Sequence, residues 1–324
     1  MYKHYYGLIR NPFELAPDSG ALFLSETHKE GLATLKYGIL SNKGFLLLTG
    51  GVGTGKTTLI NVLVKSLKPA VKVCVLSNPI LTSSEFLYFI ASKLDMPFFI
   101  NKVKFMQDFS ELLRKCVDND EKILLSIDEA HVLPVELLEE IRLLSNLAGD
   151  GLNVLSIFLV GQPELLDRLA HERLLPLRQR IGIRFHLDPF SQEDTVQYIL
   201  YRLNRAGARN TGLFSEKAVT MIHQTTHGNP RLINVLCDHA LLSGFSQEQL
   251  IIDDTTVSEC VRELHLPGDT TTFDLSPLAQ SKGKKRGLIL FLVVLFLILL
   301  TIVSSDQLRS KIFGVTIKHF FNLI

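Results

Sequence analysis

The chain has 324 residues, of which 46% are hydrophobic, and a formal net charge of +1 at pH 7. This length allows two compact units with cores of their own, and the near-zero charge excludes a chain-wide attraction to nucleic acid or to an acidic partner. The four cysteines (Cys74, Cys116, Cys237 and Cys260) are scattered without a CxxC pair, which indicates reduced thiols rather than a disulfide framework.

The first segment, Met1 to Ser41, is expected to contain helices, and Asn11-Pro12-Phe13 interrupts any regular element there. Residues 1–20 lack the apolar stretch of a signal peptide. We therefore expect the N-terminal part of the chain to stay in the cytoplasm.

A phosphate-binding loop follows at residues 50–57, where Gly-Gly-Val-Gly-Thr-Gly-Lys-Thr matches the pattern GxxxxGK[ST]. An apolar strand at 45–49 precedes it and an apolar-periodic helix at 57–64 follows, which is the structural context that the motif needs. The glycines let backbone N–H groups approach phosphate oxygens at a helix N-terminus. Lys56 is expected to reach the β and γ phosphates, and Thr57 to bind Mg²⁺. The predicted nucleotide-binding residues here are Gly50, Gly51, Val52, Gly53, Thr54, Gly55, Lys56, Thr57 and Thr58.

Strands and helices then alternate along the chain. Because parallel strands are joined by covering helices, this alternation predicts an α/β domain at residues 1–188 with a mostly parallel sheet covered on both faces. The remaining predicted strands are 71–76, 122–127, 153–160 and 183–187, and the predicted helices are 83–94, 105–117 and 135–147.

Two acids end the strand at 122–127. Since the carboxyl edge of an open α/β sheet is where ligands bind, Asp128 is predicted to hold Mg²⁺ and Glu129 to deprotonate the attacking water. His131 completes an Asp-Glu-Ala-His box that one helicase family also has, but no other helicase motif is present, and we interpret it as a histidine at a helix start. The run 101–104 lacks the aspartate that would recognise guanine, which argues against a GTPase.

Three further side chains fit a nucleotide site. Gln162 ends the fourth predicted strand and is placed to contact the γ-phosphate or the water, although a simple turn before Pro163 stays open. Arg180, with Arg178 as the alternative, precedes the fifth strand and suits an arginine that acts across a subunit boundary; a surface arginine is the alternative reading. Arg231 begins a helix and is placed to reach the γ-phosphate from a second unit, or else to form a salt bridge at the helix start.

From Pro189 the pattern becomes all-helical. Ser191 with Asp194, and then Ser215, are helix N-caps, and Pro230 starts a further helix. These signals predict a small helical lid at residues 189–266.

The remaining segments predict a membrane anchor. Residues 267–286 are rich in Pro, Gly, Thr, Ser and Lys and are expected to be a flexible basic linker. Residues 287–305 contain no charge and would span most of a bilayer as one transmembrane helix. The lysines and arginine before it place the ATPase part in the cytoplasm and residues 306–324 outside as a short tail.

Taken together, these features resemble AAA+ ATPases, and most closely the bacterial general secretion pathway protein A family, also called ExeA-like ATPases. The resemblance covers about residues 1–265. It is carried by Tyr6-Gly7-Leu8, Pro12-Phe13, Gly44-Phe45, the phosphate loop, Asp128-Glu129-Ala130, Leu143-Leu144-Ser145-Asn146, Gly161-Gln162-Pro163-Glu164-Leu165, Leu177-Arg178-Gln179-Arg180-Ile181 and Gly228-Asn229-Pro230-Arg231.

The resemblance implies a sheet of strand order 5-1-4-3-2, a helical lid, ATP and Mg²⁺ as ligands, and a homo-oligomeric ring or filament with ATP at its subunit boundaries. It implies Gln162 as the first sensor, Arg180 as the trans-acting finger and Arg231 as the second sensor. Secretion-type members continue into a periplasmic portion that often binds peptidoglycan, whereas here only residues 306–324 follow the predicted helix. The pathway therefore stays open between secretion, pilus assembly and polysaccharide export.

The sequence thus predicts an ATP hydrolase in the bacterial inner membrane that drives or regulates assembly of a cell-envelope machine with protein partners. Two alternatives are a DNA-associated ATPase of the transposition-regulator type and a nucleotide-gated scaffold with negligible turnover. The first would need a basic face or a DNA-reading module, and neither is visible in the sequence.

Overall fold

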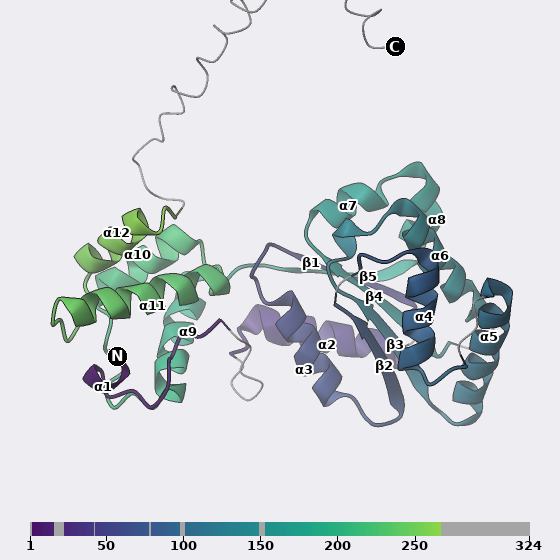
Figure 1. Cartoon of the computed structure of the whole chain (residues 1–324), viewed down its shortest axis with the longest axis horizontal. Helices are drawn as coiled ribbons and strands as arrows, with labels where there is room; N and C mark the ends of the chain where they lie inside the picture. Colours follow the sequence, from purple (N-terminus) through teal and green to yellow (C-terminus); the bar gives the residue numbers. More distant parts are fainter. Residues whose placement is uncertain are drawn as a thin grey trace, which may run out of the picture. The chain divides into compact units, whose positions relative to one another are not determined.

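The computed structural model describes residues 2–15, 23–41, 43–77, 79–97, 101–148 and 153–266 (Figure 1). The chain divides into a unit at Met1–Asp269 and a second unit at Thr270–Ile324, which lies outside the described residues. Within the described ranges, no helix combines the length and the apolar character that crossing a membrane requires. The predicted linker, transmembrane helix and tail all lie outside these ranges and stay predictions.

Five parallel strands form one sheet in the order β2-β3-β4-β1-β5. This is the expected order 5-1-4-3-2 counted from the opposite edge, so that prediction is confirmed. Two of the three interior strands, β4 and β1, are buried at every position, as expected when helices cover both faces. The strands are β1 Phe45–Gly50, β2 Val71–Leu76, β3 Lys122–Ile127, β4 Leu155–Gly161 and β5 Ile181–Leu187.

Alternate side chains of the strands enter two separate cores, because successive residues of a strand point to opposite faces. Phe45 and Leu47 of β1 pack with the helices α4 (Ser83–Lys93), α5 (Lys102–Asp118) and α6 (Val135–Leu147). Leu46 and Leu48 pack instead with α2 (Glu26–Leu40) and α3 (Lys56–Ser66). In Figure 1, these two groups of helices lie on opposite sides of the sheet.

Several short helical segments lie between the long elements. They are one or two turns long, so they carry too little hydrophobic periodicity to be recognised in the sequence. One result is that Arg178 and Arg180 lie on a helix, whereas the sequence placed them only before a strand. These segments are α1 Tyr2–Tyr5, η1 Ala130–Val132, α7 Glu164–Leu169, η2 Glu172–Leu174 and α8 Leu175–Arg180.

The all-helical part after β5, called the lid below, consists of α9 Gln192–Arg205, α10 Glu216–Thr226, α11 Pro230–Ser246 and α12 Asp254–Glu263. Ser191 and Asp194 form the capping box at the start of α9 that the sequence indicated. The lid core also contains Tyr2, Tyr6, Leu8 and Phe13 from the entry segment. The first residues of the chain therefore share a core with the lid rather than with the sheet.

Candidate nucleotide hydrolysis site

The phosphate loop turns between β1 and α3 and closes around a lysine. Gly53 and Gly55 have φ values of 77° and 100°, which are backbone conformations that favour glycine. The Lys56 ammonium is buried and donates to the carbonyl oxygens of Gly50 at 2.9 Å and Gly51 at 2.8 Å. Burial lowers the pKa of Lys56, whereas the carboxylates of Glu129 and Asp128 raise it. The loop thus presents a cation and backbone N–H groups together, which suits phosphate oxygens.

A hydroxyl and a carboxylate meet beside the loop. Thr57 Oγ1 donates to Asp128 Oδ2 at 2.5 Å, although the two residues are 71 positions apart in the chain. Asp128 is 5% exposed, and its other oxygen accepts from the backbone N–H of Glu129 at 2.9 Å. Hydroxyl and carboxylate oxygens are the hard ligands that Mg²⁺ prefers. The donor set formed by Thr57 and Asp128 therefore fits the predicted metal.

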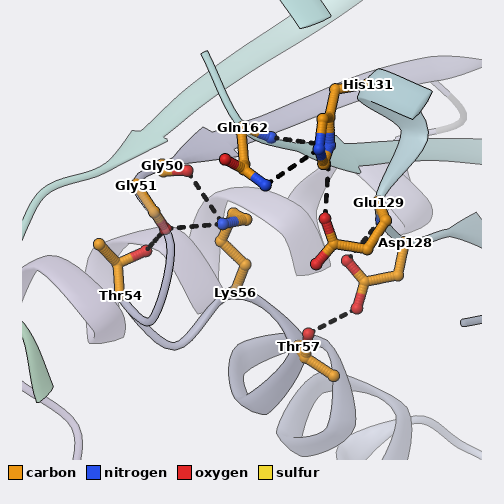
Figure 2. A network of polar contacts seen from close by, with 9 residues as sticks. All are labelled: Gly50, Gly51, Thr54, Lys56, Thr57, Asp128, Glu129, His131 and Gln162. Carbon is orange, nitrogen blue, oxygen red and sulfur yellow. Dashed lines mark hydrogen bonds and ion pairs between the residues drawn. The ribbon is translucent and has the colours of Figure 1, made fainter. Parts of the chain in front are cut away.

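A second polar group lies across the sheet edge from the loop (Figure 2). Glu129, directly after Asp128, has a φ of 52°, and its carboxylate Oε2 lies 3.3 Å from His131 Nδ1. The side-chain amide of Gln162 donates to His131 Nε2 at 2.9 Å. The structure thus brings Glu129 and Gln162 to the same place, as predicted, and adds His131 between them. The Asp-Glu-Ala-His spacing was the available signal for His131, but the sequence reading treated it only as a helix start.

The three arginines singled out in the sequence lie in different places. Arg231 lines the same cleft as the phosphate loop, together with Pro230. Arg180 is exposed at the end of α8, where it donates to Ser145 Oγ at 2.9 Å, and it does not line the cleft. Arg178 is likewise absent from the cleft lining; its carbonyl oxygen accepts from Arg184 at 3.4 Å. Of the three arginines singled out in the sequence, Arg231 is the one that lines the cleft of its own subunit.

The cleft has a volume of about 920 Å³, within the range of small-molecule sites. Lys56, Thr57, Glu129 and Gln162 lie along it with other loop residues. An aromatic group that the sequence analysis did not identify also lines the cleft, with residues from the entry segment and the start of the lid. This group, called the aromatic cluster below, consists of Phe23, Phe190, Tyr198 and Tyr201.

His28 is a further residue of the cleft that the sequence analysis missed. It is 4% exposed, and its Nε2 donates to the loop carbonyl of Thr54 at 3.2 Å. Its Nδ1 accepts from the Ser25 hydroxyl at 2.8 Å. Burial lowers the pKa of His28, so the ring is neutral at pH 7. His28 therefore fixes the back of the phosphate loop to helix α2.

The lid contacts the loop directly. Asn229, which caps α11, donates from Nδ2 to the carbonyl oxygen of Val52 at 2.6 Å. A Cβ at Gly53 would lie 2.7 Å from Asn229 Oδ1, so the close approach requires glycine there. The conformation of the loop and the position of α11 are thus linked.

Comparison with known proteins shows which family and which relatives this chain is similar to. A family model described as an AAA domain matches residues 39–169. General secretion pathway protein A of Aeromonas hydrophila is 38% identical over 250 residues, which cover 76% of this chain and 45% of that protein. The chain thus spans less than half the length of this curated relative.

Solved structures with the same fold are more distant. The Aeropyrum pernix ORC2 protein (ADPNP-ADP complexes) is 19% identical with a TM-score of 0.59, covering 78% of this chain and 71% of that one. Cdc6p from Pyrobaculum aerophilum is 18% identical with a TM-score of 0.59, covering 79% and 71%. At these identities the likeness shows the fold alone.

Proposed function

Since this chain is an AAA+ ATPase related to general secretion pathway protein A, we propose that it is a membrane-anchored enzyme that hydrolyses ATP. Its turnover drives or regulates the assembly of a cell-envelope machine for secretion, pilus formation or polysaccharide export. The relative supports a secretion role, and the uncharged run at 287–305 supports an inner-membrane anchor.

The observation that carries the enzymatic part is the meeting of Thr57 and Asp128 at 2.5 Å with Glu129 adjacent. This arrangement brings the phosphate loop, the Thr57–Asp128 oxygen pair and the carboxylate of Glu129 together at one edge of the sheet. Thr57 and Asp128 would hold Mg²⁺, which would supply charge neutralisation on the phosphate oxygens when bound. A chain that only bound nucleotide would not need the carboxylate of Glu129.

Each side chain of the cleft has a defined task in this proposal. Lys56 leaves its two loop carbonyls to bind phosphate oxygens, and Glu129 takes the proton from the attacking water. Gln162 orients that water or the γ-phosphate, and Arg231 contacts the phosphate from the lid. The aromatic cluster offers stacking surfaces for the base.

Arg180 acts in a neighbouring subunit. Its guanidinium is exposed and lies outside the cleft of its own chain. It therefore suits a second copy in a ring or filament, where it stabilises charge on the transferring phosphoryl group. The likeness to ORC and Cdc6 proteins shows a shared fold and does not transfer any association with DNA to this chain.

The first test is Glu129→Gln in the full-length protein. We expect ATP affinity within about threefold of wild type and hydrolysis at least ~100-fold slower, because a general base typically contributes 10²–10⁴-fold. Lys56→Ala should lose nucleotide binding itself. Glu193→Gln, an exposed carboxylate on α9, is the matched control and should leave turnover unchanged. Near-normal hydrolysis by Glu129→Gln would remove Glu129 from its assigned role.

The cellular part is tested by crosslinking from membranes of cells that produce the Glu129→Gln form, with Lys56→Ala as the nucleotide-free control. We expect the protein in the carbonate-resistant membrane fraction and envelope-assembly components enriched with the Glu129→Gln form. Recovery in the soluble fraction, or enrichment of nucleoid proteins alone, would contradict the proposed anchor and role.

A further inference from the structure

We infer that His131 is a positioning residue, which connects the amide of Gln162 to the carboxylate of Glu129 and so sets the direction in which Glu129 faces. This inference rests on the proposed ATP hydrolysis and adds a residue to it. The three side chains come from three places: the end of β3, the short helix η1 and the end of β4.

The direction of the hydrogen bonds follows from the donor chemistry. The side-chain nitrogen of Gln162 can only donate, so His131 Nε2 accepts at 2.9 Å. A neutral imidazole with a bare Nε2 carries its proton on Nδ1. That Nδ1–H faces Glu129 Oε2 at 3.3 Å. The result is a continuous chain from the amide of Gln162 through the ring to the carboxylate of Glu129.

A second contact of His131 Nδ1 competes with the one to Glu129 and is weaker than it. The backbone N–H of Gln162 lies 3.5 Å from His131 Nδ1, at the outer limit of a hydrogen bond. In one tautomer Nδ1 cannot both donate and accept. The ionised carboxylate is the stronger partner, because charge-assisted hydrogen bonds exceed neutral ones. The contact with Glu129 therefore outweighs the backbone contact, and it agrees with the tautomer that the side-chain amide of Gln162 selects.

The backbone around His131 leaves the ring little freedom. At Gly161 an added Cβ would lie 3.2 Å from His131 N and 3.4 Å from Nδ1, so β4 and η1 approach closely there. The His131 side chain is 15% exposed, whereas that of Glu129 is 44% exposed. Glu129 has room to move and His131 does not. The fixed ring is thus the group that restricts the mobile carboxylate.

Positioning of this kind changes the rate rather than the affinity. A base must lie within hydrogen-bond reach of the proton that it takes, and small misplacements slow the reaction strongly. His131 does not line the cleft, and in the proposed function the nucleotide and its Mg²⁺ are bound by Lys56, Thr57 and Asp128 without it. Loss of His131 should therefore lower kcat and leave the KM for ATP nearly unchanged.

The kinetic test uses full-length His131→Ala and His131→Asn. We expect kcat of the Ala variant to fall by ~10- to 100-fold with KM within about twofold, in line with the effects of misplacing a catalytic group. His131→Asn keeps an amide donor near the position of Nδ1, so its kcat should be at least about fivefold higher than that of His131→Ala. His171→Ala, an exposed histidine at η2, is the matched control. Unchanged kcat in His131→Ala, or a fall in melting temperature that accounts for the loss equally in Ala and Asn, would overturn the inference.

A spectroscopic test needs no turnover. Imidazole ¹⁵N shifts of full-length wild type should show His131 with a protonated Nδ1 and a bare Nε2. In Gln162→Leu, which lacks the donor to Nε2, the ring should return to the Nε2–H form that a free imidazole prefers. An Nε2–H ring in wild type would overturn the inference. If wild type shows the Nδ1–H ring but does not hydrolyse ATP, the proposed function fails while the link through His131 stands.

Discussion

At the residue scale, the phosphate loop is supported by a histidine that is neutral because it is buried. Both ring nitrogens of His28 are bonded, to Ser25 and to the carbonyl oxygen of Thr54. Its pKa is lowered mainly by burial, against smaller opposing effects from Thr54 and Asp194. Because it supports the phosphate loop from behind, protonation of His28 would disturb the nucleotide site as well as the fold.

The sign of the pH effect follows from this lowered pKa. Below the unfolded-state pKa of about 6.5, the unfolded chain binds a proton that folded His28 resists, so the free energy of unfolding falls as the pH falls. The contribution is present above about pH 6.5 and decreases as the pH falls towards the folded-state pKa. His28→Gln keeps a donor and does not titrate, so denaturant unfolding at pH 7 and pH 5 should show a smaller pH dependence than wild type. Equal pH dependence in the two proteins would contradict this assignment.

At the scale of elements, the turn between α10 and α11 packs against the segment that leads into α9. Gly228 has a φ of 71°, and its carbonyl oxygen accepts from the backbone N–H of Phe190 at 2.9 Å. An added Cβ at Gly228 would lie 1.9 Å from the carbonyl oxygen of Phe190. The next residue, Asn229, caps α11 and bonds to the loop at Val52. Glycine at this position thus permits the approach that brings Arg231 to the cleft.

Gly228→Ala should therefore destabilise the protein and weaken ATP binding together. Both the left-handed backbone and the contact with Phe190 oppose a side chain, and we expect a loss of roughly 2 kcal/mol or more in the free energy of unfolding. Denaturant titration and ATP affinity are the measurements. Gly212→Ala is the control, because an added Cβ there meets only the side chain of Asn210 at 3.2 Å. If Gly228→Ala were as stable as Gly212→Ala, the turn would accommodate an added Cβ and the prediction would be wrong.

At the scale of the whole molecule, the described part of the chain is built around separate hydrophobic cores, and thiols lie in two of them. Cys74 and Cys116 are buried in the core formed by one face of the sheet, and Cys237 and Cys260 are buried in the lid core. Burial raises the pKa of Cys74 to about 12 and that of Cys260 to about 11. It also raises the pKa values of Cys116 and Cys237. All four thiols are therefore protected from solvent and held in the unreactive protonated form.

Thiol labelling should test directly whether the four cysteines are buried in the folded protein. At pH 8 the native protein should incorporate no thiol reagent on the time scale of minutes, and the guanidinium-unfolded protein should incorporate four equivalents, one for each cysteine of the chain. Mass spectrometry of the labelled protein identifies the reactive positions. Rapid labelling of any cysteine under native conditions would contradict the burial described above.

Many elements of the fold and several residues of the candidate site could be predicted from local sequence. The strands at 71–76 and 122–127 and the helix at 135–147 have the predicted bounds, because their hydrophobic periods and end signals lie within the segments themselves. The strand order followed from the family resemblance. The phosphate loop and the two acids were identified because their chemistry requires particular residue types next to a strand.

Other features were decided only by the tertiary structure, because they join residues far apart in the chain. His131 and Gln162 are 31 positions apart and Asn229 and Val52 are 177 apart, and no local pattern marks such a pair. The same reason applies to the aromatic cluster and to the entry segment that packs into the lid core. Local sequence specifies which groups can do the chemistry, whereas the path of the backbone specifies which of them meet.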